Sequence, residues 1–256
     1  MTKRFELIKN FIEIIKLPNK KFNYNYKIKK GYLNELDIFL HHKITSFIKK
    51  NYSKDNIISE ENYKNNISLK KNNYSWVIDP LCGTTNFTHS IPFFSTSISL
   101  NYNNKCIFSF IKDWQNKELF YSFKGKSYLG NETINVSNKK KLSNSIVFLN
   151  CNQSDHKNID NNLVKLINAL KPPVTRRIHI LESANLELAY IACGRADAYI
   201  NFQDNIWDIN AGSLLIKNAG GETKFINKKE KTKNIGIIAS NKNIFKKINT
   251  IVKTLI

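Results

Sequence analysis

The chain has 256 residues, of which 41% are hydrophobic, and 40 Lys and Arg residues outnumber 20 Asp and Glu residues to give a net charge of +20. This length and hydrophobic content are enough for one large folded unit or two small ones. No stretch of about 18 apolar residues exists, so a membrane-spanning helix is not expected.

The first half of the chain is predicted to combine two helices with a sheet. Apolar residues recur at helical spacing over 2–16, which predicts an amphipathic helix that packs on a core or, alternatively, lies on a membrane surface. A second helix is predicted over 34–50. Strands are then predicted at 56–61 and at 75–80, where Pro80 is expected to stop the strand. A series of short apolar runs separated by turn residues predicts an antiparallel sheet with strands within 93–103, 105–113, 117–125 and 126–130. A further strand is expected within 144–150.

After about residue 155, helical and strand patterns alternate. Ser183 is expected to cap the N-terminus of one helix, and Gly220 and Gly221 to close another. Helices are predicted over 158–170, 183–194, 207–221 and 242–255, and strands over 176–181, 196–202, 222–226 and 236–240. The order indicates layered sheets and helices of the α+β or α/β class. We expect a single domain over 1–256, with an N-terminal α+β half up to about residue 150 and a C-terminal α/β half from about 151.

The positive charge has two explanations. A strongly basic chain is typical of a partner such as RNA. Yet the sequence is crowded with Lys, Asn and Ile, the residues that AT-rich codons favour, so mutational bias is the favoured cause of the charge, and RNA contact stays open beside it. The basic clusters at 27–30, 139–141 and 228–233 are scattered and have no interleaved aromatic residues.

The four cysteines indicate neither a disulfide framework nor a zinc-binding motif. Cys82, Cys106, Cys151 and Cys193 are far apart in the sequence, and no CxxC pattern exists. The first 20 residues carry charges throughout and have no small-residue cleavage site, so they do not read as a signal peptide. We therefore expect a cytoplasmic protein with reduced thiols.

Three acidic residues fall at the ends of predicted elements. Glu60 follows one strand, Asp79 follows another, and Asp208 starts a helix, where it reads as an N-cap. Hard cations such as Mg²⁺ take oxygen ligands from a few carboxylates. The stretch WVIDPLCGTTNF at 76–87 also places a helix start behind Gly83, where backbone N–H groups can receive a phosphate. The combination predicts a site for metal and phosphate.

These motifs resemble a known family. Glu60-Glu61, WVIDPLCGTTNF and WDINAG at 207–212 are similar to the signatures of the inositol monophosphatase family, Asp-Pro-(Leu/Ile)-Asp-Gly-Thr-x-Asn-Phe and Trp-Asp-x-(Ala)-Ala-Gly. The segments 186–200 and 214–222 also look like family segments, and the chain looks most like the bacterial SuhB type. The resemblance implies an αβαβα sandwich and lithium-sensitive, Mg²⁺-dependent hydrolysis of a phosphate monoester such as inositol-1-phosphate.

The resemblance also implies roles for residues. Glu60 would bind one metal and orient the attacking water, and Asp79 would bridge two metals. The Leu81 carbonyl would complete the first site, Thr84 would assist the water, and Asp208 would bind the second metal. Two such ions about 3.5–4 Å apart can activate water and stabilise the leaving oxygen. Asp37 falls where the family has an acid near the site. Substrate contacts would come from Leu81, Cys82, Gly83, Thr84, His179, Asn201 and Asp208.

Several positions depart from the family pattern. Cys82 replaces the aspartate that shares the second metal, and a neutral thiol offers Mg²⁺ little. Asn201 replaces a glutamate that contacts substrate hydroxyls, Glu182 replaces a glycine in a turn, and His179 replaces an arginine, although Arg177 is close in sequence. These changes predict weakened catalysis on a retained scaffold.

Other roles for Cys82 are open. A cysteine phosphatase needs a phosphate-binding loop that ends in Arg, which is absent from the sequence. A redox switch has no supporting motif. A zinc or manganese site built from Asp79, Cys82 and Asp208 is the remaining alternative.

Two functions follow from the resemblance. The favoured one is that of an accessory factor in ribosomal RNA transcription antitermination and ribosome biogenesis, with RNA polymerase, Nus factors and ribosomal RNA as partners. The alternative is an active Mg²⁺-dependent inositol-1-phosphate phosphatase. The family implies a homodimer. His41 and His42 do not have the spacing of a metal-binding motif, and they are expected on the surface or at a dimer face.

Overall fold

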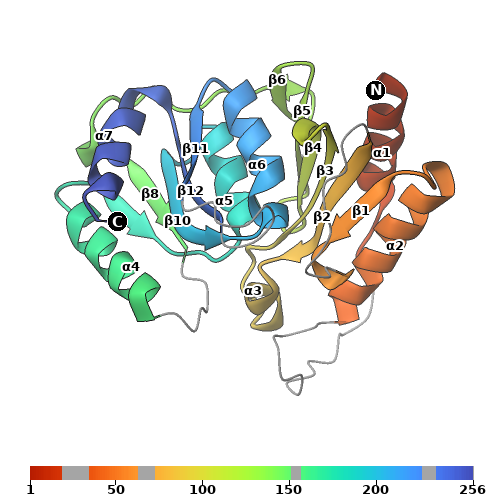
Figure 1. Cartoon of the computed structure of the whole chain (residues 1–256), viewed down its shortest axis with the longest axis horizontal. Helices are drawn as coiled ribbons and strands as arrows, with labels where there is room; N and C mark the ends of the chain where they lie inside the picture. Colours follow the sequence, from red (N-terminus) through yellow and green to blue (C-terminus); the bar gives the residue numbers. More distant parts are fainter. Residues whose placement is uncertain (19–34, 63–72, 151–156, 227–234, 256) are drawn as a thin grey trace.

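Two mixed sheets alternate with three helical layers (Figure 1). The computed structural model describes residues 1–18, 35–62, 73–150, 157–226 and 235–255. From one side to the other, Figure 1 shows helices α1 and α2, the first sheet, helices α5 and α6, the second sheet, and helices α4 and α7. This is the α+β sandwich with the αβαβα layering that was predicted. Within the described residues, no helix is long and apolar enough to cross a membrane.

The first sheet follows the chain order. Its strands β1 and β2 pair in parallel, and each later neighbour pairs antiparallel. The strands are β1 (Asn56–Ser59), β2 (Tyr74–Cys82), β3 (Ser95–Tyr102), β4 (Lys105–Asp113), β5 (Glu118–Phe123), β6 (Lys126–Leu129) and β7 (Glu132–Thr133).

Pro80 does not end β2, contrary to the prediction from sequence. The strand continues to Cys82, and its register against β3 shifts between Asp79 and Cys82. Proline has no N–H group for the ladder, and an irregularity of this kind accommodates it inside a strand. The shift places Asp79, Leu81 and Cys82 at the edge where the two sheets approach each other.

Helices α1 (Thr2–Ile14) and α2 (Glu35–Asn51) cover the outer face of the first sheet. Phe5, Ile8 and Ile12 of α1 are buried, and the Phe5 ring stacks on Phe123 with centroids 3.9 Å apart. The core-packed reading of this helix is therefore confirmed, and its apolar face is not free to lie on a membrane.

His41 lies inside the protein, contrary to the prediction that it is a surface residue. It is only 9% exposed, and its Nδ1 lies 2.9 Å from the Ser59 hydroxyl oxygen. Position 41 faces the sheet because it is one turn after Asp37 and one turn before Thr45, which are both buried. His42, the next residue, is exposed.

The second sheet and its helices form the other half of the sandwich. Its order is β11-β12-β10-β8-β9, with parallel pairs at β10–β8 and β8–β9 and antiparallel pairs elsewhere. The strands are β8 (Ile146–Leu149), β9 (Arg177–His179), β10 (Ala198–Asp204), β11 (Glu222–Ile226) and β12 (Ile235–Ser240). The covering helices are α4 (Lys157–Leu170) and α7 (Lys242–Lys253).

The middle layer consists of α5 (Ala184–Ala192) and α6 (Ile206–Asn218), which are buried along most of their length. A Cβ atom at Gly212 would lie 2.4 Å from the Leu188 Cβ, so glycine allows these helices to approach closely. Both sheets pack on this layer. Residues of α5 and α6 therefore approach the site from the middle layer, whereas those of β2 approach it from the first sheet.

Candidate active site and divalent-cation cluster

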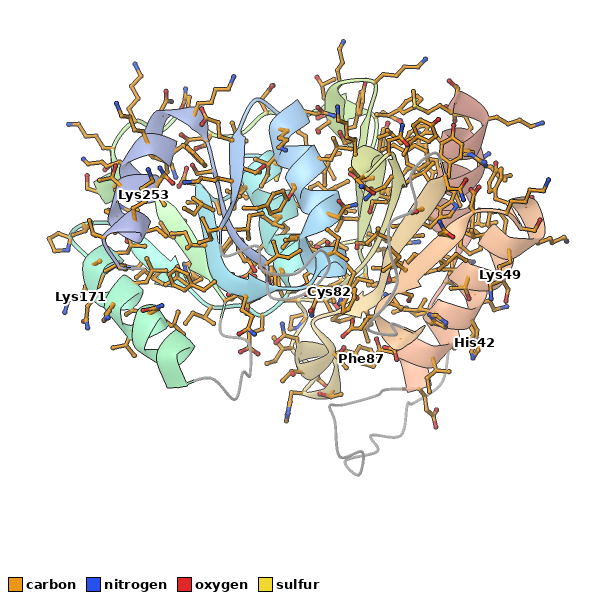
Figure 2. The ribbon with its side chains drawn as sticks, in the orientation of Figure 1. His42, Lys49, Cys82, Phe87, Lys171 and Lys253 are labelled. Atoms are coloured by element: carbon orange, nitrogen blue, oxygen red, sulfur yellow. The ribbon has the colours of Figure 1, made fainter. Side chains whose placement is uncertain are left out.

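The three predicted acids come together between the sheets. Glu60 opens a short 3₁₀ turn (Glu60–Asn62) after β1, Asp79 lies on β2, and Asp208 lies in the first turn of α6. One ligand atom from each of Asp79, Cys82 and Asp208 lies within 4.8 Å of the other two. Figure 2 shows Cys82 near the middle of the molecule, where the two halves meet above α3 (Thr84–Thr88).

The turn after β2 requires glycine. Gly83 has a φ of +89°, and a Cβ there would lie 2.9 Å from the Phe93 carbonyl oxygen. The turn starts α3, and Thr84 donates from its hydroxyl to the Leu81 carbonyl oxygen at 2.9 Å. The same hydroxyl oxygen lies 3.5 Å from Oδ2 of the buried Asp37. Thr84, Leu81 and Asp37 thus form one connected group at the rim of the cluster.

Asp208 does not cap α6 as the sequence suggested. Asn205 is the N-cap residue, and Asp208, three residues later, accepts a hydrogen bond from the Asn205 backbone N–H at 2.8 Å. This is the reciprocal pair of a capping box. It fixes the carboxylate of Asp208 at the helix start, facing Asp79.

The charges of the cluster repel one another. Burial, followed by the charges of Asp208 and Asp37, raises the pKa of Asp79 well above its usual value. The pKa of Glu60 is also raised well above its usual value, because protein atoms crowd the carboxylate and the charges of Asp79 and Asp208 lie nearby. Glu60 as a whole residue is nevertheless exposed to solvent. Burial raises the pKa of Asp208 to about 6. A cation among these carboxylates would remove the repulsion.

The residues fit one hard cation. Oδ1 of Asp79 is buried and has no hydrogen-bond partner among the described residues, while Oδ2 accepts from the Asn185 side-chain amide at 3.0 Å. Glu60 and the Leu81 carbonyl would add further oxygen ligands of the kind that Mg²⁺ prefers. A second hard cation between Asp79 and Asp208 fits poorly, because its third ligand atom is the Cys82 sulfur.

Cys82 is a free, buried thiol, 6% exposed. Burial and the charges of Asp79 and Asp208 raise its pKa well above the usual range. Ser183 is the N-cap residue of α5, as predicted, but its hydroxyl makes no capping bond and donates to the Cys82 carbonyl oxygen at 3.2 Å.

A cavity of about 400 Å³ opens beside the cluster. Among the predicted substrate contacts, Leu81, Cys82, Gly83, Thr84 and Asp208 line it. His179 and Asn201 are not among its lining residues. His179 is exposed on β9, and Arg177 is exposed with its guanidinium bonded to the Arg176 carbonyl oxygen at 2.8 Å.

Sequence reasoning missed a carboxylate in this cavity. Asp204, the last residue of β10, lines it and is only 2% exposed. Asn201 donates to Oδ1 of Asp204 at 2.7 Å, and the Tyr199 hydroxyl donates to Oδ2 at 3.1 Å. Asn201 therefore positions another acid rather than lining the cavity itself. The sequence signal that could have identified Asp204 is an aspartate at the end of a strand, directly before a helix cap. The strand-end position of Asp79 had been used in the same way.

Glu182 also lines the cavity, at the position noted as a departure from glycine. Its φ is +55°, in the left-handed region that favours glycine. The substitution therefore adds both backbone strain and a negative charge to the wall of the cavity.

Comparison with known proteins gives a consistent picture. The model of the inositol monophosphatase family matches residues 1–256. The chain is 33% identical over 233 residues to Nus factor SuhB of Pseudomonas aeruginosa, covering 90% of this chain and 85% of that protein. It is 38% identical over 177 residues to inositol monophosphatase of Dictyostelium discoideum, covering 66% and 63% of the two chains.

Solved structures agree with the sequence relatives. The extragenic suppressor protein suhB of Bartonella henselae superposes with a TM-score of 0.78 at 26% identity, covering 100% of this chain and 96% of that one. An inositol monophosphatase of Thermotoga maritima superposes with a TM-score of 0.76 at 27% identity, covering 99% and 93%. With its fold, its carboxylate cluster and a family match over every residue, this chain belongs to the inositol monophosphatase family.

Proposed function

We propose that the chain is an accessory factor in ribosomal RNA transcription antitermination and ribosome biogenesis, and that its Mg²⁺-dependent phosphatase site is weakened. The observation that carries the proposal is Cys82, a buried thiol beside Asp79 and Asp208, where the family resemblance implies a cation-binding carboxylate. A relative named Nus factor SuhB, matched over 90% of this chain, supports the accessory role. The cell compartment that fits is the cytoplasm.

The proposed partners are RNA polymerase, Nus factors and ribosomal RNA. The net charge of +20 supports RNA contact whatever its evolutionary origin, because the field acts on phosphates in either case. Figure 2 places Lys49 on one outer side of the molecule and Lys171 and Lys253 on the other. The basic segments 27–30 and 228–233 lie outside the described residues.

An active phosphatase is the second candidate, because the other residues to which the resemblance gives catalytic roles line one cavity. Mg²⁺, when bound, would polarise the phosphoryl group and activate water. Glu60 and Thr84 would hold the attacking water on one side of the cavity, with Oδ2 of Asp37 at 3.5 Å from the Thr84 hydroxyl oxygen. The start of α3 would direct backbone N–H groups toward the phosphate, and Asp204 would accept hydrogen bonds from substrate hydroxyls.

An antitermination assay separates the candidates. RNA polymerase and Nus factors would transcribe a ribosomal leader that ends in a terminator, with and without the full chain. We expect the chain to raise read-through and to bind the leader RNA with a strong dependence on salt. Thr84→Ala, which removes a hydroxyl from the candidate catalytic site, should leave read-through unchanged. Absence of stimulation, or its loss in Thr84→Ala, would contradict the accessory role.

A further inference from the structure

Three ligand atoms of different chemical hardness converge at the end of β2. Carboxylate oxygens of Asp79 and Asp208 and the sulfur of Cys82 lie within 4.8 Å of one another. In a tetrahedral site with metal bonds of about 2.0–2.3 Å, ligand atoms are separated by about 3.3–3.8 Å. Side-chain movements of about 1 Å would therefore bring these three atoms onto one ion.

Asp79, which the resemblance implies would bridge both cation positions, also points to a ligand at this place. The side chain of Asp79 is completely buried, and its Oδ1 has no hydrogen-bond partner among the described residues. Its other oxygen is held by Asn185, so the unpartnered oxygen is fixed in orientation. A buried carboxylate oxygen without a partner is costly unless an ion or another group satisfies it.

The donor set selects the ion. Thiolate sulfur prefers Zn²⁺ or Cu⁺ to Mg²⁺, whereas carboxylate oxygen accepts Zn²⁺ as well. We propose that Asp79, Cys82 and Asp208 form a Zn²⁺ site, so that Cys82 changes the metal preference of the second cation position rather than merely removing a ligand. The sulfur–zinc bond forms as the thiol proton leaves to solvent.

The surroundings suit such a site. Three protein ligands leave one position of a tetrahedral ion open, and the three residues line a cavity of about 400 Å³ that has room for water or a substrate oxygen. The inference rests on the divalent-cation site that the proposed function assigns to this cavity. It does not depend on RNA polymerase or on ribosomal RNA.

Cobalt substitution tests the site in the full chain. After chelation, Co²⁺ would be titrated into the protein, and absorption from thiolate-to-cobalt charge transfer in the near ultraviolet would be recorded. We expect one equivalent of Co²⁺ to produce this band, Zn²⁺ to abolish it, and a large excess of Mg²⁺ to leave it intact. Cys82→Ser should remove the band and lower Zn²⁺ affinity at least about 100-fold, beyond the usual cost of an outer-shell change.

Matched controls come from the other cysteines. Cys106→Ser, Cys151→Ser and Cys193→Ser should each keep the band. Asp208→Asn retains the thiol and should weaken Co²⁺ binding, and circular dichroism would establish that each variant is folded. A wild-type protein without the band, or a band that persists in Cys82→Ser, would overturn the proposal. Because the readout is metal binding, its failure is distinguishable from a failed antitermination assay.

Discussion

The side-chain amide of Asn185 on α5 donates to Oδ2 of Asp79 on β2 at 3.0 Å, across 106 positions of sequence. The same amide donates to the Trp207 carbonyl oxygen at 3.2 Å. Both Asn185 and Asp79 are completely buried. Asn185 therefore connects the central carboxylate of the candidate site to both helices of the middle layer.

Replacing Asn185 should destabilise the fold. In Asn185→Ala, a buried carboxylate loses its partner, and we expect the free energy of unfolding to fall by about 1–3 kcal/mol. Urea denaturation followed by circular dichroism measures this change. Asn51→Ala, at an exposed asparagine whose side-chain amide donates to the Phe47 carbonyl oxygen, is the control and should change stability by less than about 0.5 kcal/mol. Equal losses in both variants would show that Asn185 has no special role.

Glu182 offers a stabilising substitution. Its left-handed backbone is strained for a residue with a side chain, and Glu182→Gly should raise the free energy of unfolding by about 1 kcal/mol. Glu182→Gln removes the charge but keeps the strain, so it should recover little of this gain. A larger gain from Glu182→Gln than from Glu182→Gly would assign the cost to charge instead.

Glu187 predicts a specific pH dependence. Burial raises its pKa well above 4.5, and its Oε2 has no partner among the described residues. The folded state therefore holds the proton more tightly than the unfolded state. The stabilisation is complete below pH 4.5 and is lost as pH rises through the folded pKa, at up to about 1.4 kcal/mol per pH unit.

Glu187→Gln should remove this dependence while keeping the side-chain shape. Its oxygen can still accept the Leu181 backbone N–H, which lies 3.2 Å from Oε1. The stability of the variant relative to the wild type should increase from pH 4.5 upward, as measured by urea denaturation at several pH values. Parallel stability curves for the two proteins would be evidence against a proton on Glu187.

Lys112 closes the C-terminal end of α1. Its ammonium group donates to the carbonyl oxygens of Ile12 at 2.6 Å and Ile15 at 2.9 Å. Lys112→Met keeps an apolar stem beside Trp114 but removes both bonds, so the free energy of unfolding should fall by about 1–2 kcal/mol. Hydrogen exchange of α1 should accelerate. Lys105→Met, at an exposed position of the same strand, should change neither quantity.

The layers of the fold were predictable because their signals are local. Period-2 and period-3.6 patterns predicted the longer helices and every described strand except β7, and the Asp79–Thr84 motif marked the centre of the candidate site. Predictions from local sequence patterns were wrong where tertiary contacts determine where an element ends. Pro80 was expected to end β2, yet pairing with β3 carries the strand on to Cys82.

Contacts between distant residues explain why Asp204 was not predicted from the sequence. Asp204 enters the cavity because β10 ends beside α6, and nothing within the strand itself shows which cavity that end faces. The substrate contacts that the resemblance implies for Asn201 and His179 stay predictions. In the structure the Asn201 amide is bonded to Asp204, and His179 is exposed because β9 is the edge strand of the second sheet.

Hydrolysis of inositol-1-phosphate across a Mg²⁺ series, for wild type and Cys82→Asp in chelator-treated buffer, tests the central claim most directly. We expect the wild type to turn over far below about 1 s⁻¹. Cys82→Asp should gain at least about 100-fold, the scale of one electrostatic contact to a transition state. A wild-type rate of about 1 s⁻¹ or more, with no gain in Cys82→Asp, would contradict a weakened site and make the phosphatase the leading function.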